Sequence, residues 1–259
     1  MNIGNYKIIQ QISEGGFGRI FQARHTILEE YACLKQNIRS SPEDIELLRK
    51  EAKLLWRLSS HHSIPSAKDF FKVATNNYVM VMDYIEGQTL DQLVEKNSGI
   101  HPEDACRITE RLLSALYYCH FYGVIHSDVK PENVFINPKK NELDIKLIDF
   151  GLAALNPNST TKPIGYTEKY VAPELLIGRP PIPETDIYGA GIVMLYALGG
   201  DVSAKTLPKK TPPEIIDYVN RLLRYDPTER PTWDKDNPLA RLSDVRLKVF
   251  GRRHKSEKT

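Results

Sequence analysis

Cysteine, tryptophan and long apolar runs are scarce in this sequence. Its 259 residues include three cysteines and two tryptophans. Cys33, Cys106 and Cys119 stand in apolar settings without paired spacing, so we predict reduced core thiols and no zinc site. The longest apolar run, residues 192–198, is too short to span a bilayer. We therefore expect a cytoplasmic protein of a reducing compartment, with no membrane partner.

We also predict no leader sequence, and the net charge is small. Residues 1–5 have neither a basic flank nor an apolar run, which predicts no signal peptide, and Asn2 does not fit the myristoylation pattern. The net charge of +2 gives no argument for a nucleic-acid partner, and we expect a monomer. The basic excess lies in residues 246–258, which we expect to form a solvated tail, with an acidic partner or nucleic acid as alternatives.

What the sequence does contain is a dense run of polar residues from 126 to 151. Asp128, Lys130 and Asn133 share one turn, and Asp149 follows after a short strand-like stretch, 143–148. An isolated Asp or Asn is usually a turn residue. Here two carboxylates, an amide and an ammonium occur together. Their oxygens suit Mg²⁺, and the ammonium can neutralise a moving phosphoryl group.

This run resembles the catalytic loop and the metal-binding turn of the eukaryotic-type serine/threonine protein kinases. The resemblance implies that Asp128 accepts the proton of the substrate hydroxyl and that Lys130 contacts the γ-phosphate. It also implies that Asn133 and Asp149 bind two Mg²⁺ ions and that Phe135 lies under adenine.

A glycine-rich turn between two strand-like runs lies near the start of the chain. Taken alone it predicts a plain hairpin. In the kinase family such a turn brings backbone N–H groups close to phosphates. Ser13 replaces the usual first glycine, a departure that can stiffen the loop and weaken nucleotide affinity. The nucleotide contacts implied here are Ile12, Ser13, Glu14, Gly15, Gly16, Phe17, Gly18, Arg19 and Ile20.

The next strand ends in Lys35, and a helix follows it. Ser41 can cap this helix, Pro42 suits its first position, and its apolar residues recur at helical spacing. The resemblance implies that Lys35 holds the α- and β-phosphates and pairs with a glutamate of the helix, for which we choose Glu51. The implied adenine contacts are Cys33, Met82 as gatekeeper, and Asp83, Tyr84 and Ile85 as the hinge.

Two residues indicate how activity is controlled and what is phosphorylated. Ser127 stands where the family usually has an arginine that pairs with a phosphorylated residue of the activation segment. Serine cannot supply that charge, so we expect activity without activation-loop phosphorylation. Thr167 stands where serine/threonine kinases place a threonine that contacts the catalytic aspartate and lysine.

The second half of the chain contains further matches to the family. Asp186, at the start of an apolar helix, is implied to hold the catalytic-loop backbone, although a plain helix cap is compatible. Glu174 is implied to pair with Arg230. Residues 201–211 are so short that we expect the helix usually found there to be missing or reduced to a turn. We expect a final helix over 239–250.

The resemblance covers residues 6–232 and implies an α+β, two-lobed protein kinase fold. We expect a small antiparallel β lobe with one helix (1–82), a mainly helical lobe (83–235), and a C-terminal helix and basic tail (236–259). The implied reaction transfers the γ-phosphoryl group of ATP, with Mg²⁺, to Ser/Thr hydroxyls of protein substrates. The alternatives are a pseudokinase that binds nucleotide without turnover and a small-molecule kinase.

Overall fold

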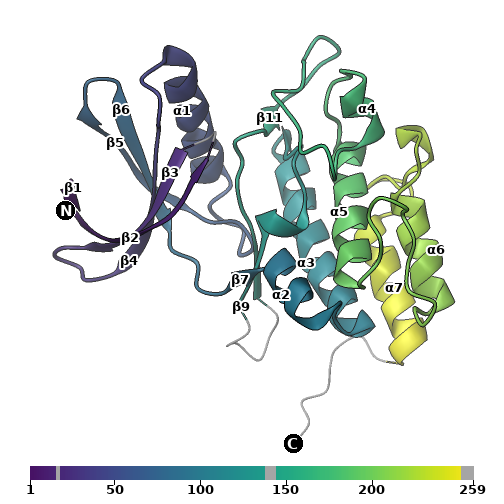
Figure 1. Ribbon diagram of the computed structural model, residues 1–259. Coiled ribbons are helices and arrows are strands. Elements are labelled where there is room, and N and C mark those ends of the chain that lie inside the picture. Colours follow the sequence, from purple (N-terminus) through teal and green to yellow (C-terminus); the bar gives the residue numbers. More distant parts are fainter. Residues whose placement is uncertain (16–17, 138–143, 252–259) are drawn as a thin grey trace, which may run out of the picture. The chain divides into compact units, whose positions relative to one another are not determined.

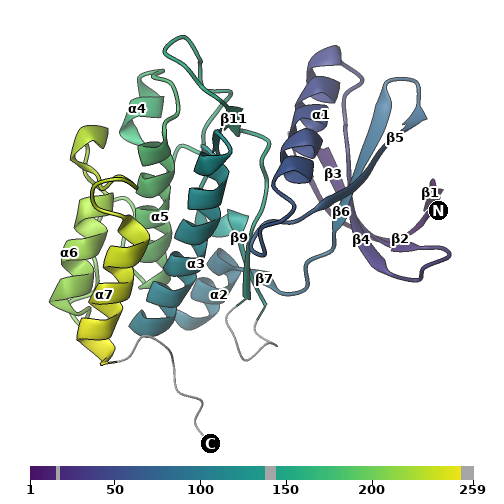
Figure 2. The ribbon, with the colours of Figure 1, turned by 180° about the vertical axis from the view of Figure 1, so that it is seen from behind.

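An antiparallel sheet of six strands and one helix form the first of two units in the chain. The structure is a computed structural model and describes residues 1–15, 18–137 and 144–251. The first unit comprises Met1–Glu86 and Ile148–Gly151, and the second comprises Gly87–Leu147 and the chain from Leu152 onward. Figures 1 and 2 show the elements of both units.

The six strands of the first unit lie in the order β1-β2-β3-β4-β6-β5. Each neighbouring pair is antiparallel. Small and branched apolar side chains, among them Ala23, Leu34, Val79 and Val81, form a buried cluster on this sheet. The strands are β1 (Asn2–Ile3), β2 (Tyr6–Gly15), β3 (Gly18–His25), β4 (Tyr31–Gln36), β5 (Ala67–Ala74) and β6 (Asn77–Asp83).

The helix of this unit, α1 (Pro42–Arg57), begins as the sequence predicts. The Ser41 side chain accepts a hydrogen bond from the Asp44 backbone N–H at 3.1 Å, and Pro42 occupies the first turn. Most of its apolar residues, among them Ile45, Leu48 and Leu55, lie on one buried face, and the helix packs against β5 and β6. Glu51 lies on the same buried face, one turn from Leu48 and Leu55.

The second unit is mainly helical. Its longest helices are arranged around α5 (Pro183–Ala197), which is apolar on nearly every side and buried along most of its length. Figures 1 and 2 show α5 between α3 and α6, and α7 packs against α3 and α6. The other helices are α2 (Leu90–Asn97), α3 (Pro102–Phe121), α4 (Pro173–Leu176), α6 (Pro213–Leu222) and α7 (Pro238–Phe250).

Five short strands in the second unit flank the polar loop that the sequence singles out. They form two small sheets, β10-β9-β7 and β11-β8. The loop runs from β8 through the 3₁₀ turn Pro131–Asn133 into β9. Of the predicted strand 143–148, residue 143 lies outside the described residues. The strands are β7 (Gln88–Thr89), β8 (Val124–Ile125), β9 (Val134–Asn137), β10 (Asp144–Leu147) and β11 (Ala154–Leu155).

The predicted α+β class, with an antiparallel sheet and one helix followed by a helical part, is confirmed. The missing helix after α5 is confirmed as well. In residues 198–212, all of which are described, the chain makes an isolated bridge between Asp201 and Thr206 and no helix. Their backbone groups exchange hydrogen bonds of 2.9 and 3.1 Å.

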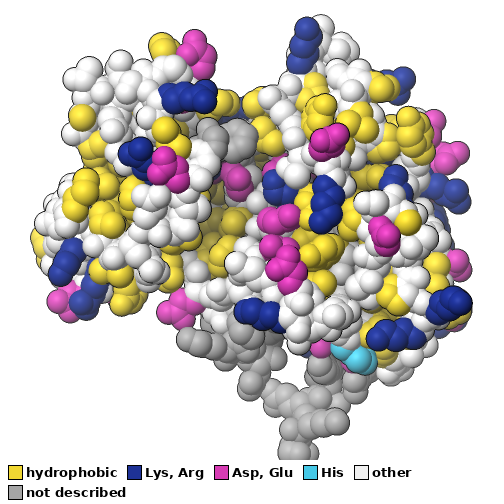
Figure 3. All heavy atoms as spheres, in the orientation of Figure 1, with side chains coloured by type: hydrophobic (Ala, Val, Ile, Leu, Met, Phe, Trp, Pro, Cys, Tyr) yellow, Lys and Arg dark blue, Asp and Glu magenta, His cyan; other side chains and the backbone are white. Residues whose placement is uncertain are grey.

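In the described ranges no helix is both long enough and apolar enough to cross a membrane. Lys and Arg side chains alternate with Asp and Glu over the face of the second unit seen in Figure 3. This mixture agrees with the small net charge of +2. The predicted basic tail falls largely on residues 252–259, which lie outside the described residues.

A buried ion pair joins distant segments of the second unit. Arg230 donates to both carboxylate oxygens of Glu174, at 2.7 and 2.8 Å, and both side chains are almost fully buried. Burial alone raises the pKa of Glu174, but hydrogen bonds, chiefly from Arg230, outweigh it and lower the pKa below its ordinary value. The pairing predicted from the sequence is therefore present, and it is bidentate.

Replacing Arg230 by Met should lower the free energy of unfolding by about 3 to 5 kcal/mol, because it leaves the Glu174 carboxylate buried without its cation. Urea unfolding at neutral pH measures the loss. Since the pKa of Glu174 is lowered by folding, its contribution is present at neutral pH and disappears as the pH falls through the folded value.

The matched control is Arg221→Met, which breaks an ion pair with Asp236 whose side chains are 35% and 37% exposed. A loss of no more than about 1 kcal/mol is expected there. Equal losses for the two variants would contradict the importance of the buried pair.

Candidate active site

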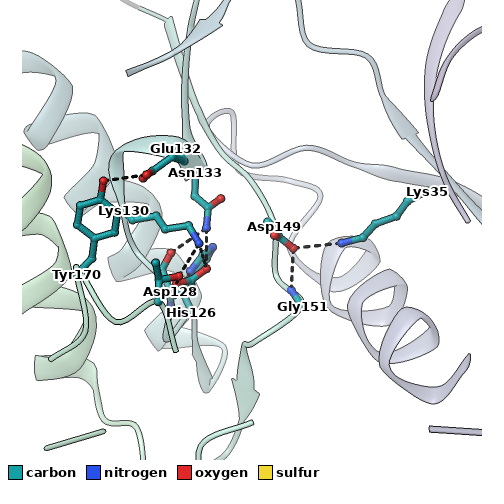
Figure 4. Close-up of polar contacts among 10 residues, drawn as sticks. Lys35, His126, Asp128, Lys130, Glu132, Asn133, Asp149, Gly151 and Tyr170 are labelled. Atoms are coloured by element: carbon teal, nitrogen blue, oxygen red, sulfur yellow. Dashed lines mark hydrogen bonds and ion pairs between the residues drawn. The ribbon is translucent and has the colours of Figure 1, made fainter. Parts of the chain in front are cut away.

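The first polar cluster surrounds Lys35 on strand β4. Its Nζ donates to Glu51 Oε1 at 2.9 Å, to Glu51 Oε2 at 2.7 Å and to Asp149 Oδ1 at 3.1 Å. Figure 4 shows the contact with Asp149. The Lys35 side chain is 3% exposed. The structure therefore brings Lys35 to the glutamate chosen from the sequence, and adds a second carboxylate.

The charges of this cluster keep Lys35 protonated. Burial by itself lowers the pKa of Lys35, but the carboxylates of Glu51 and Asp149 outweigh it, so the pKa lies above its ordinary value. A charged ammonium held at a fixed place by two carboxylates is suited to contact anionic phosphate oxygens.

Asp149 occupies a strained turn next to the buried Phe150. Its backbone φ is +59°, a left-handed conformation that costs energy for a residue other than glycine. Its Oδ1 accepts from the Gly151 backbone N–H at 3.3 Å as well as from Lys35, and the side chain is 33% exposed. A partly exposed carboxylate held in this way is a suitable oxygen ligand for Mg²⁺.

The glycine-rich segment forms the hairpin between β2 and β3. Gly15 pairs with Gly18, and Ser13 pairs with Ile20, so Ser13 lies in the strand rather than in the turn. Gly18 has a φ of +142°, and a Cβ there would lie 2.8 Å from the Gln36 carbonyl oxygen. Only glycine fits that position. The predicted contacts Gly16 and Phe17 lie outside the described residues.

The residues expected to contact adenine fall into both units. Cys33 on β4 pairs with Met82 on β6 in the first unit, where Tyr84 and Ile85 also lie. Phe135 is on β9 of the second unit. The Asp83 side chain is already engaged, because its carboxylate accepts from the Ser66 N–H and pairs with Lys68. Its backbone N–H donates to the Ser66 carbonyl at 3.1 Å as well.

The second polar cluster surrounds Asp128 in the loop after β8 (Figure 4). Its Oδ1 accepts from the Thr167 hydroxyl at 2.7 Å, and its Oδ2 accepts from Lys130 Nζ at 2.6 Å. Lys130 Nζ also donates to Thr167 Oγ1 at 2.7 Å. Because an ammonium only donates, the Thr167 hydroxyl accepts from Lys130 and directs its own proton to Asp128.

Asn133 completes this cluster. Its amide nitrogen donates to the Asp128 backbone oxygen at 2.9 Å and to Asp128 Oδ2 at 3.1 Å. These contacts turn the amide oxygen away from Asp128, as Figure 4 shows. An amide oxygen in that orientation is a hard ligand of the kind that Mg²⁺ accepts, so the donor type fits the predicted metal role.

A buried carboxylate holds the loop that carries Asp128. Asp186, at the start of α5, accepts from the backbone N–H groups of His126 and Ser127, both at 2.8 Å. Ser127 has a φ of +67°, which is unfavourable for serine without such support. Asp186 thus makes the backbone contacts that the sequence led us to expect. Its Oδ2 also meets His120 Nε2 at 2.8 Å.

Sequence reasoning missed several supporting residues. His120, Trp233 and the hydrogen bond from Tyr170 to Glu132 received no role, although all lie in this network. The Tyr170 hydroxyl donates to Glu132 Oε1 at 2.8 Å, and burial together with this carboxylate raises the Tyr170 pKa. These contacts join residues 38 to 113 positions apart, and no local pattern signals them.

Most of the chain is similar in sequence to known proteins. A family model described as protein kinase domain matches residues 6–207. Serine/threonine-protein kinase pkn3 of Myxococcus xanthus is 32% identical over 206 residues, covering 75% of this chain and 38% of the relative. PrkC of Bacillus subtilis is 31% identical over 205 residues, covering 77% and 31%. CDPK-related kinase 5 of Arabidopsis thaliana is 32% identical over 228 residues, covering 76% and 38%. The chain thus spans less than half the length of these relatives.

The site cysteine should be unreactive in the folded chain. Burial raises the pKa of Cys33 to about 12 despite the nearby Lys35, and burial raises the pKa of Cys106 to about 12 and that of Cys119 still further. At pH 8 a thiol of pKa about 12 is ionised in only about one molecule in ten thousand. Iodoacetamide followed by mass spectrometry should therefore label none of them.

The same reaction in concentrated urea is the control, because all three thiols become exposed there and should be alkylated. Rapid labelling of Cys33 in the folded protein would contradict the burial of its thiol.

Proposed function

The chain belongs to the protein kinase domain family, and we propose that it transfers the γ-phosphoryl group of ATP to serine or threonine hydroxyls of protein substrates. The observation that carries this proposal is the closed set of contacts among Asp128, Lys130 and Thr167. A carboxylate that can accept a proton lies beside an ammonium that can neutralise a phosphoryl group, and a hydroxyl fixes both.

Asp128 is the proposed base for the attacking hydroxyl. Thr167 and Lys130 hold its two oxygens in a defined orientation, so the carboxylate does not have to reorganise when a substrate hydroxyl approaches. Lys130 lies 2.6 Å from Oδ2 and can contact the transferred group without losing its place. Catalysis in this proposal comes from positioning and charge neutralisation.

Asn133 and Asp149 are the proposed Mg²⁺ ligands, and Lys35 is the proposed contact of the α- and β-phosphates. Mg²⁺ held by these two residues would supply positive charge that neutralises the phosphates. The amide oxygen of Asn133 and the partly exposed carboxylate of Asp149 support these roles. Glu51 supports the role of Lys35, because its two hydrogen bonds keep the ammonium in one position.

The remaining nucleotide contacts are proposed from the family pattern. The backbone of the hairpin 12–20 would cradle the phosphates, and the hinge 83–85 would meet adenine together with Cys33, Met82 and Phe135. The backbone of Gly18 packs so closely on the Gln36 carbonyl that a Cβ would not fit, which supports a tight hairpin. The boundary at residue 235 stays a prediction, and α7 belongs to the same compact unit as the helices before it.

Activity is proposed not to require phosphorylation of the activation segment. Ser127 offers no cation for a phosphate, and Asp186 already holds its backbone in the required conformation. The segment also has polar contacts of its own. Asn158 Oδ1 accepts from the Thr160 N–H at 2.9 Å, and the Asn158 N–H donates to Thr161 Oγ1 at 2.9 Å. The first of these contacts needs no hydroxyl, and it supports an ordered segment without added charge.

Transfer of labelled phosphate from γ-labelled ATP in the presence of Mg²⁺ tests the proposal. Wild type should label itself or a generic basic protein on serine or threonine. Asp128→Asn should reduce the rate by about 10² to 10⁴, because it removes the base. Lys35→Met should also abolish transfer.

Lys72→Met is the matched control for Lys35, since Lys72 is an exposed lysine of the same sheet. It should leave the rate unchanged. No transfer by wild type, with nucleotide still bound, would instead favour the pseudokinase alternative.

The triple variant Ser159→Ala, Thr160→Ala, Thr161→Ala should keep wild-type turnover if no activation-loop phosphate is needed. Initial rates of phosphate transfer measure this. Thr167→Ala, in the same segment, is the positive control and should lose about tenfold or more, because the bridge between Lys130 and Asp128 is broken. Complete loss of turnover in the triple variant would refute phosphate-independent activity.

A further inference from the structure

Trp233 lies outside the catalytic loop but is linked to it by a chain of hydrogen bonds. It contacts His120, and His120 contacts Asp186, which holds the loop. Trp233 lies in a turn held by the hydrogen bond from the Asp236 N–H to the Thr232 carbonyl at 3.1 Å. Its indole Nε1 donates to His120 Nδ1 at 2.8 Å. The Tyr117 ring packs edge-on against the indole, with centroids 5.2 Å apart. The contact therefore has both a polar and an apolar part.

This contact and the Asp186 carboxylate require the same nitrogen of His120 to carry the proton. An indole N–H can only donate, so His120 Nδ1 must accept and is unprotonated. The proton is then on Nε2, which lies 2.8 Å from Asp186 Oδ2 and donates to it. With the opposite tautomer, Nδ1–H would face the indole N–H and the Nε2 lone pair would face the carboxylate. Both contacts would become repulsive.

Asp186 connects the His120 ring to the backbone of the loop. Its Oδ2 accepts from His120 and from the His126 N–H, and its Oδ1 accepts from the Ser127 N–H. Both side chains of the His120–Asp186 pair are nearly inaccessible, so water cannot replace a lost bond there. Ser127, in its left-handed conformation, immediately precedes Asp128.

We propose that Trp233 is a positioning residue of the catalytic loop. By donating to Nδ1, it holds the His120 ring in place, and the Nε2–H of that ring keeps the Asp186 carboxylate in the orientation that holds Ser127 and therefore Asp128. This inference rests on the proposed phosphotransfer function. Trp233 touches no reacting group, so its effect should fall on turnover and not on nucleotide affinity.

The test replaces Trp233 by Phe, which keeps a ring against Tyr117 but removes the indole N–H. The kcat for phosphate transfer should fall about five- to tenfold, the effect of one lost hydrogen bond, while the KM for ATP stays unchanged. Trp56→Phe is the matched control. Trp56 is 63% exposed on α1 of the first unit, and its replacement should change neither constant.

Nitrogen NMR of ¹⁵N-histidine-labelled protein provides the second readout, with His120→Gln used to assign the signal. In wild type, the His120 proton should be on Nε2 and Nδ1 should show the chemical shift of a nitrogen that accepts a hydrogen bond. In Trp233→Phe the Nδ1 signal should move to the shift of a nitrogen that has lost its donor. A wild-type His120 protonated on Nδ1 would overturn the inference, even if the Phe variant failed to fold. An unchanged kcat in a folded Trp233→Phe variant would overturn it too.

The two readouts separate this inference from the function on which it rests. If wild type transfers no phosphate while the His120 Nδ1 signal moves in Trp233→Phe, the proposed function fails and the positioning contact stands. If wild type is active and the Nδ1 signal is the same in both proteins, the function stands and the positioning role is rejected.

Discussion

The buried carboxylate of Asp186 is the constraint on which the candidate catalytic loop depends. It accepts two adjacent backbone N–H groups, and one of them belongs to Ser127, whose φ of +67° is costly for serine. Without these bonds the chain would relax toward a more common conformation. Asp128 follows directly, so the backbone that carries it is held by a residue 58 positions further along the chain. The loop is therefore positioned by the core helix α5 in addition to its own internal contacts, such as that of Asn133 with the Asp128 backbone oxygen.

Each unit also contains one cluster of charged side chains whose members are paired and hydrogen-bonded. In the first unit, Lys35 is held by Glu51 and Asp149, and in the second, Asp128 is held by Thr167, Lys130 and Asn133. Buried charges are tolerated only when they are paired and hydrogen-bonded. The contacts that offset the free-energy cost of burying these charges also fix the side chains in single orientations, as phosphoryl transfer requires.

Much of this was predictable from the sequence, for identifiable reasons. The family pattern led to Glu51 as the partner of Lys35 and to Arg230 as the partner of Glu174, and helical spacing predicted the buried face of α1 on which Glu51 lies. The contact of Trp233 with His120 could not be predicted, because 113 residues separate them and a tryptophan in a turn normally indicates packing. The backbone strain at Ser127 was likewise hidden, since propensities describe the cost of a conformation and not the distant group that offsets it.

Amide hydrogen exchange at His126 and Ser127, followed by NMR in the folded protein, tests the central claim most directly. Both amides are in a loop, where exchange is ordinarily fast. If Asp186 holds them, they should exchange as slowly as the amides of α5, because only a large opening of the second unit would expose them. Exchange at the rate of exposed loop amides would show that the carboxylate does not hold the loop, and would contradict this account of how Asp128 is positioned.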